Sequence, residues 1–135
     1  MAAEVLLKLA RLTNNAAWRE HAKAILAAAG TILQRYPTGA GRMLGALDFH
    51  LAPGREVVLV GEDRAALHAT AAARYRPYDL LAGGPPAEVA ALAPRVPLFA
   101  GRTALEGRPT AYVCAGQTCQ LPVHTPEELA GLLEG

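Results

Sequence analysis

The residues best suited to chemistry in this chain are its two cysteines, Cys114 and Cys119. They flank residues 115–118, Ala-Gly-Gln-Thr, and glycine at the first position of a two-residue loop is typical of a type II′ hairpin turn. If Gly116 and Gln117 form that loop, the cysteines face each other as a non-hydrogen-bonded pair, with Cα atoms roughly 4.5 Å apart. That separation is near the short end of the disulfide range, so the spacing permits a somewhat strained, reducible cross-strand disulfide.

Three interpretations of the cysteine pair remain open. Cys114 and Cys119 could be two small buried thiols that support the hairpin, as free cysteines often are. They could form a redox pair, although the Cys-x-x-Cys motif of redox proteins has a shorter loop. With His124 they could also contribute to a metal site, but a structural zinc needs four ligands and a fourth would come from elsewhere. The sequence therefore predicts no metal and no cofactor.

A second group of residues follows from the expected sheet, because ligands of open parallel sheets bind beyond the carboxyl ends of the strands. The predicted strand ends carry Glu62 and Asp63, then Gly83 and Gly84, and then Arg102. Glycines let a backbone approach a ligand closely, and Arg102 could hold an anion. The plainer interpretation is that all of these are turn residues and that Asp63 caps a helix.

Several catalytic motifs are absent from the sequence. There is no Gly-x-Gly-x-x-Gly after a strand, no phosphate-binding loop and no Gly-x-Ser-x-Gly elbow. The chain has no serine at all, which excludes serine hydrolases. The sequence predicts no catalytic residue.

The elements that position these residues begin with helices. Apolar residues recur at helical spacing in residues 5–12, 16–35 and 43–51, and Asn15 is a suitable N-cap for the second segment. The first two segments predict a helical hairpin with a short connection.

The second half of the chain alternates strands with helices. The continuous apolar run Val-Val-Leu-Val at 57–60 is typical of a strand that is covered on both faces. Thr125, followed by proline and with Glu128 three residues on, predicts a capping box and a final helix. The predicted strands cover residues 56–60, 78–82, 96–100 and 110–114. The expected fold is α/β: a helical hairpin packed on a small, mostly parallel four-stranded sheet, with a C-terminal cysteine hairpin and helix.

The composition argues against two classes of binding partner, nucleic acids and membranes. The 135 residues carry a net charge of +1 with no basic stripe and few aromatic residues, which argues against nucleic-acid binding. No secretory leader and no apolar stretch of about 20 residues is present, so we expect no membrane association and a cytoplasmic location.

Seven segments together resemble a known family. They are Leu-x-x-Leu-Ala-x-Leu-Thr at 6–13, Trp-Arg-Glu-His-Ala at 18–22, Ala-Leu-Asp at 46–48, Glu-Val-Val-Leu-Val-Gly at 56–61, Tyr-Val-Cys at 112–114, Cys119, and Leu-Pro-Val at 121–123. The order is similar to the C-terminal end of the thioredoxin-domain-containing family that includes the spermatogenesis-associated proteins. Long members combine a thioredoxin-like domain with an (α/α)6 toroid like that of N-acylglucosamine 2-epimerases and six-hairpin glycosidases.

The resemblance implies a division of the chain and a set of functions. Residues 1–52 would be the last helices of the toroid, and residues 53–135 a small α/β domain. The implied function is a non-catalytic C-terminal domain or fragment that serves as a scaffold or interaction module. Two alternatives are a thiol–disulfide module that uses Cys114 and Cys119, and a remnant of a sugar-active, 2-epimerase-like enzyme. A toroid hairpin without its neighbours would expose an apolar face, so we expect self-association or a protein partner through the helical segment.

Overall fold

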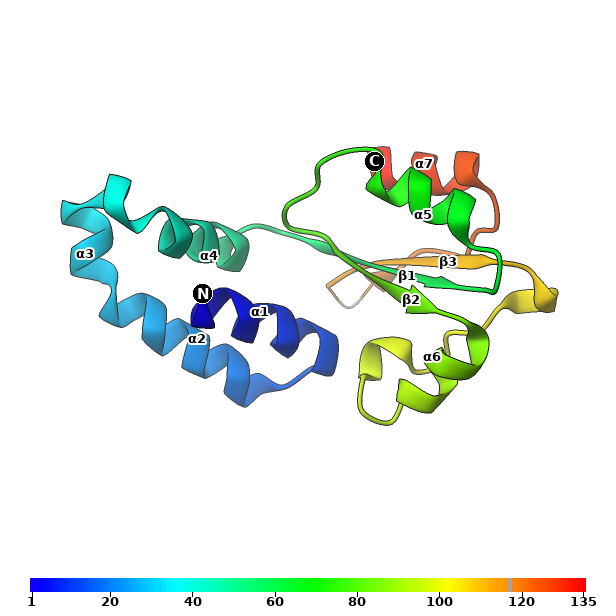
Figure 1. Ribbon diagram of the computed structural model, residues 1–135, viewed down its shortest axis with the longest axis horizontal. Coiled ribbons are helices and arrows are strands. Elements are labelled where there is room, and N and C mark those ends of the chain that lie inside the picture. The colour runs from blue at the N-terminus through cyan, green and yellow to red at the C-terminus, as the bar shows by residue number, and fades with distance from the viewer. Residues whose placement is uncertain (117) are drawn as a thin grey trace. The chain divides into compact units, whose positions relative to one another are not determined.

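The computed structural model describes residues 1–116 and 118–135, which form two compact units, Met1–Pro53 and Gly54–Gly135. The first unit is helical, and the second combines helices with a four-stranded sheet (Figure 1). This content confirms the α/β fold class, whereas the packing of the helical hairpin on the sheet stays a prediction. Within the described residues, no helix has both the length and the apolar character needed to cross a membrane.

The helical unit opens with the predicted hairpin, formed by α1 (Ala2–Thr13) and α2 (Ala16–Ala28). Asn14 ends α1 with a left-handed φ of 52°, a conformation that asparagine tolerates better than most residues. Asn15 then caps α2 as expected, since its side chain accepts a hydrogen bond from the backbone N–H of Trp18 at 3.3 Å. Two consecutive asparagines therefore reverse the chain between the helices.

The rest of this unit consists of α3 (Gly30–Arg35), a 3₁₀ turn η1 (Pro37–Ala40) and α4 (Gly41–Leu51). The single helix predicted for residues 16–35 is wrong, because the helix is interrupted at Ala29, just before a glycine that lowers helix propensity. α1 packs against α2 and α4, and several of the buried residues of these helices are alanines, which let helices approach closely. The buried apolar residues are Ala3, Leu7, Ala10, Ala22, Leu26, Ala46 and Phe49.

The four strands are β1 (Arg55–Val60), β2 (Leu80–Gly84), β3 (Thr110–Ala115) and β4 (Thr118–Cys119). They lie in the order β2-β1-β3-β4. β1 and β2 are parallel and are joined through α5 (Ala65–Ala72), but β3 is antiparallel to both β1 and β4. The sheet is therefore mixed, which corrects the expected mostly parallel arrangement.

The strand predicted for residues 96–100 is also wrong, because a 3₁₀ turn, η2 (Pro97–Phe99), lies there. Pro97 has a fixed φ and no N–H, so it suits the start of a helical turn better than a central strand. The N–H of Phe99 closes the turn on the carbonyl of Val96 at 2.8 Å. The chain then passes a second turn, η3 (Leu105–Gly107), and enters the sheet antiparallel to β1.

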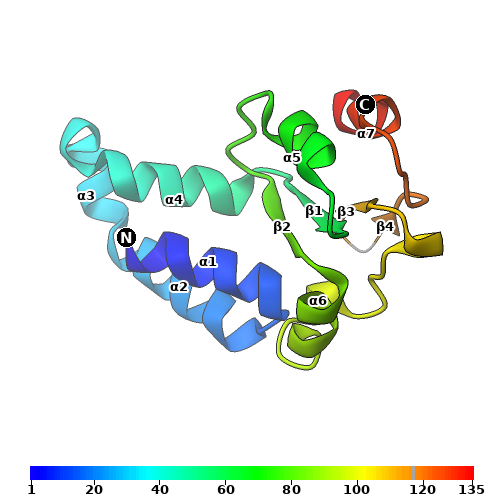
Figure 2. The ribbon, with the colours of Figure 1, turned by 45° about the vertical axis from the view of Figure 1, so that its right-hand side comes forward.

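Helices cover both faces of the sheet. α5 and α7 (Pro126–Glu134) lie on one face, and α6 (Pro86–Leu92) lies on the other (Figures 1 and 2). β1 supplies both cores by alternation: Val57 and Leu59 pack toward α5 and α7, whereas Val58 and Val60 pack with Val89 of α6. The apolar run at 57–60 is thus explained by burial on two sides.

The final helix has the predicted capping box. The backbone N–H of Glu128 donates to Oγ1 of Thr125 at 3.3 Å, and Oε2 of Glu128 accepts from the N–H of Thr125 at 3.1 Å. The same carboxylate accepts from the N–H of His124 at 3.1 Å. These backbone donors, His124 first and then Thr125, lower the pKa of Glu128 because they stabilise its ionised form.

Candidate thiol–disulfide site

The two cysteines form a disulfide between β3 and β4, with Cα atoms 4.0 Å apart. Cys114 is directly opposite Cys119 in the register, as the hairpin spacing predicts. The N–H of Gln120 donates to the carbonyl of Val113 at 2.9 Å, so the next pair along is hydrogen-bonded and the cysteine pair is the non-hydrogen-bonded kind. This arrangement also matches the expectation.

The hairpin loop is described in part. Gly116 has a φ of 61°, in the left-handed region required at the first position of the predicted turn. Gln117 lies outside the described residues, so the type II′ assignment stays a prediction.

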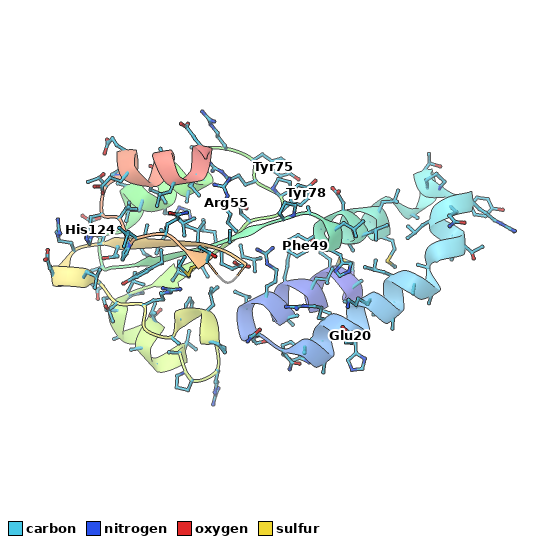
Figure 3. The ribbon with its side chains drawn as sticks, turned by 180° about the vertical axis from the view of Figure 1, so that it is seen from behind. Glu20, Phe49, Arg55, Tyr75, Tyr78 and His124 are labelled. Carbon is cyan, nitrogen blue, oxygen red and sulfur yellow. A yellow bond between two sulfur atoms is a disulfide. The ribbon has the colours of Figure 1, made fainter. Side chains whose placement is uncertain are left out.

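The two sulfur-bearing residues differ in exposure. Cys114 lies on β3 between two neighbouring strands and is 5% exposed. Cys119 lies on β4 at the edge of the sheet and is exposed. Figure 3 draws the bond between the two sulfur atoms in yellow. The pair therefore has one protected residue and one that solvent reaches.

The positively charged side chain of Arg102 lies next to both sulfur atoms of the disulfide. Its Nη2 lies 3.2 Å from Sγ of Cys114 and 3.2 Å from Sγ of Cys119. The guanidinium also lies over the ring of Tyr112, with Cζ 4.9 Å from the ring centroid. Sulfur is a weak hydrogen-bond acceptor, so the cation has only weak partners at this end. Within the described chain, the buried Nε of Arg102 has no hydrogen-bond partner.

A tyrosine anchors the segment that carries this arginine. The hydroxyl of Tyr112 donates to the carbonyl of Thr103 at 2.7 Å and accepts from the N–H of Thr103 at 3.2 Å. Because Tyr112 and Cys114 are two residues apart on β3, they face the same side of the sheet. β3 thus carries both Cys114 and Tyr112. The ring of Tyr112 lies under the guanidinium, and its hydroxyl anchors Thr103, the residue after Arg102.

A carboxylate lies on the same side of the sheet. Glu56 is directly opposite Cys114 in the β1–β3 register, and directly opposite residues share a face. Arg102 and Glu56 therefore bring charges of opposite sign to this side of the sheet, and these have opposite effects on a thiolate.

The residues predicted to line one ligand edge lie at two separate places. Glu62 and Asp63 follow β1 and are exposed, and Gly83 and Gly84 lie within β2 beside the end of β1. Arg102 instead contacts the cysteines, next to the amino end of β1. The antiparallel direction of β3 explains the division, because its carboxyl end meets the amino end of β1. The structure brings Arg102 to the disulfide and not to the other four residues.

Beside the carboxyl end of β1, Gly83 allows close packing of β2 on β1. Gly83 has a φ of 153°, and a Cβ there would overlap the backbone carbonyl of Leu59 on β1. Asp63 does not cap α5, which corrects the expectation: the N-cap position is Arg64, whose Nη1 donates to the carbonyl of Gly61 at 2.9 Å.

His124, the third residue considered as a metal ligand, has its ring next to two polar groups of the α/β unit. Its Nδ1 lies 3.1 Å from the carbonyl oxygen of Pro109 and 3.3 Å from Oγ1 of the buried Thr110. Among the described residues, no three His, Cys, Asp or Glu side chains are grouped so that they could bind a metal ion.

Sequence reasoning missed the association of Arg102 with the cysteines. It assigned Arg102 to the end of a strand that does not form. The available signal was the pattern Tyr-x-Cys at 112–114, which places an aromatic ring beside the cysteine on the same face.

Comparison with known proteins gives two relatives of one kind. Human spermatogenesis-associated protein 20 is 30% identical over 139 aligned positions, which cover 98% of this chain and 17% of the human protein. The protein of the same name in rat is 28% identical over the same shares of both chains. This chain thus spans 17% of the length of the curated relatives it matches. No family model matches the chain, and no solved structure matches it. The resemblance found in the sequence is confirmed: over nearly its whole length, the chain is similar to the spermatogenesis-associated proteins.

Proposed function

We propose that this chain is an accessory domain of a longer polypeptide of the spermatogenesis-associated kind, and that its working site is a reversible disulfide between Cys114 and Cys119. One observation carries the proposal: an exposed cysteine is bonded to a buried one, and the Nη2 of Arg102 lies 3.2 Å from both sulfurs. Cationic neighbours lower the pKa of a thiol and so favour the reactive thiolate. The arrangement suits a bond that opens and closes.

The position of the bond supports this function. It closes a loop with a sequence separation of only 5, where a disulfide contributes less to stability than one that closes a long loop. β3 is also held to β1 along all six of its residues, independently of the cysteines. The hairpin can therefore open without removing β3 from the sheet.

A glutathione titration tests the proposal. The full chain is equilibrated across buffers of stepped glutathione ratio, quenched with acid and alkylated, and the two-thiol form is counted by mass spectrometry. We expect a midpoint between about −180 and −280 mV, the range of exchanging protein disulfides. A pair that stays oxidised below about −300 mV is a structural disulfide, and one that stays reduced under strongly oxidising buffer never forms the bond. Either result contradicts the proposal.

A second candidate function concerns the helical unit. α4 carries a hollow of about 420 Å³, lined by Leu44, Gly45, Leu47, Asp48 and Leu51. Leu51 is 72% exposed, and Ile32 and Tyr36 of the same unit are also exposed. We propose that the apolar surface of α4 around this hollow packs against a further helix of the longer polypeptide, since the relatives extend far beyond the matched segment. This would be the scaffold or interaction role.

Self-association of the isolated chain tests the second candidate, because an uncovered apolar face should pair with itself. Sedimentation velocity should show dimers or larger species at high concentration, and a hydrophobic dye should bind. Leu51→Asp should reduce both effects. Leu121→Asp is the matched control, because Leu121 is 85% exposed in the other unit. A wild-type chain that stays monomeric and binds no dye, or two variants with equal effects, would contradict the role of α4.

A further inference from the structure

We propose that the two cysteines have different roles: Cys119 is the sulfur that exchanges with an external thiol, and Cys114 is the leaving group, whose thiolate Arg102 stabilises. The inference rests on the proposed function and goes beyond it, because it assigns a distinct role to each sulfur and to the arginine.

The roles of the cysteines follow from their exposure. An external thiolate must reach the sulfur that it attacks, and Cys119 lies exposed on the edge strand β4. Cys114 is 5% exposed on β3, which has neighbours on both sides. Attack at Cys119 therefore makes Cys114 the leaving group.

The reaction balances with a small thiol, RSH, as the reductant. A thiolate RS⁻ forms a bond to Sγ of Cys119, the Cys114–Cys119 bond breaks, and the electron pair remains on Sγ of Cys114. A second RS⁻ then attacks the RS sulfur of the mixed disulfide, which releases RSSR and leaves Cys119 as a thiolate. The protons from the two RSH molecules supply any thiol that becomes protonated. Two thiols are oxidised to RSSR, and the protein disulfide is reduced.

Arg102 interacts differently with the two redox states. In the disulfide state its Nη2 has two neutral sulfurs as acceptors, and its buried Nε has no partner in the described chain. Reduction places a negative charge on Sγ of Cys114, at a distance where a charge-assisted hydrogen bond forms. The stacking on Tyr112 and the anchoring of Thr103 hold the guanidinium in place for this contact. The cation should therefore favour the reduced state.

The surrounding groups make this a balance of charges. Glu56, opposite Cys114 on β1, disfavours a thiolate, and Arg102 favours one. The Tyr112 hydroxyl donates to the Thr103 carbonyl, so that proton is directed to a backbone oxygen. Removal of Arg102 and removal of Glu56 should thus have opposite effects on the thiol pKa.

The first test compares variants of the 135-residue chain in their equilibrium with glutathione and in the pH profile of thiol alkylation. Arg102→Gln should lower the equilibrium constant for reduction at least about tenfold, equivalent to about 30 mV for two electrons, and should move alkylation to higher pH. Arg102→Lys should restore part of both effects because it keeps the charge. Glu56→Gln should move alkylation to lower pH. The matched control is Arg108→Gln, because Arg108 is exposed and pairs with Glu106 at 2.7 Å. It should behave as wild type.

The second test needs no variant and stands even if Arg102→Gln fails to fold. The oxidised wild-type chain is mixed briefly with reduced glutathione and quenched, and the mixed disulfide is located by tandem mass spectrometry. Glutathione should be found mainly on Cys119. Glutathione mainly on Cys114, or a folded Arg102→Gln chain with wild-type equilibrium and pH profile, would overturn the inference. In both of those cases the disulfide still exchanges, so the proposed function stands. A wild-type disulfide that never opens would contradict both the inference and the proposed function.

Discussion

Reduction of the Cys114–Cys119 bond should leave the α/β unit folded. The bond has a sequence separation of 5, and the loop-closure estimate for so short a ring is about 2 kcal/mol at 25 °C. A domain of this size is typically stable by about 4 to 12 kcal/mol. β3 keeps its pairing with β1, and Ala111 remains bonded to Val123 through N···O contacts of 2.8 and 3.0 Å. The remaining interactions should therefore hold the sheet together.

Urea unfolding followed by circular dichroism measures this loss in the oxidised chain, the reduced chain and a Cys114→Ala/Cys119→Ala double variant. With an m value of about 1 to 1.5 kcal/mol/M, a loss of about 2 kcal/mol lowers the midpoint by about 1.5 M. The double variant should match the reduced chain, because both lack the cross-link. A reduced chain that is unfolded without urea, or a loss above about 4 kcal/mol, would show a structural disulfide and refute the reasoning.

Two further predictions concern the packing and the electrostatics of the α/β unit. Gly83→Ala should destabilise it by about 3 kcal/mol, because φ is 153° and the new Cβ overlaps the backbone of β1; Gly131→Ala, with open space around it, is the control in thermal melting. Glu128→Gln should remove a pH-dependent part of the stability, because N–H groups of His124 and Thr125 lower the pKa of this carboxyl. That part is present above the ordinary value of 4.5 and is lost as the pH falls through the lowered pKa. Urea midpoints of wild type and variant should therefore converge in acid, and a constant difference across the pH range would contradict the role of the carboxylate.

Most of the local signals in the sequence predicted local structure correctly, although Asp63 does not cap α5. Asn15 and Thr125 cap helices as expected, because a side chain that accepts from a backbone N–H two or three residues later acts within one turn. The cysteine register was equally local, since the loop length fixes which residues face each other in a hairpin. These features depend on a few neighbouring residues and so can be read from sequence.

Features that depend on distant parts of the chain were harder to predict. The direction of β3 depends on how the chain returns to the sheet, and the strand assigned to residues 96–100 gave a false parallel connection. The apolar residues there still enter the core, with Phe99 7% exposed, but from a 3₁₀ turn and not from a strand. Periodicity in so short a segment does not distinguish the two.

The candidate site shows the same limit. The cysteines were identified from their spacing, but the arginine beside them comes from a loop 12 residues before Cys114. The contact depends on Tyr112 of β3 binding Thr103 across the turn η3, which the spacing of the residues does not predict. The glycines of the expected ligand edge show a second limit. A glycine permits both close packing of strands and close approach of a ligand, so the sequence alone does not distinguish the two roles. In the structure, Gly83 packs closely against the backbone of Leu59.

The most direct test of the central claim is the redox state of Cys114 and Cys119 in the native polypeptide within the cells that make it. Cells are pulsed with an oxidant or a membrane-permeant reductant and quenched in acid. The thiols are labelled, and the protein is recovered with an antibody to this chain. If the hairpin is a reversible thiol–disulfide site, the reduced fraction should rise with reductant, fall with oxidant and return after each pulse is removed. A pair that stays fully oxidised or fully reduced through both pulses would contradict the account.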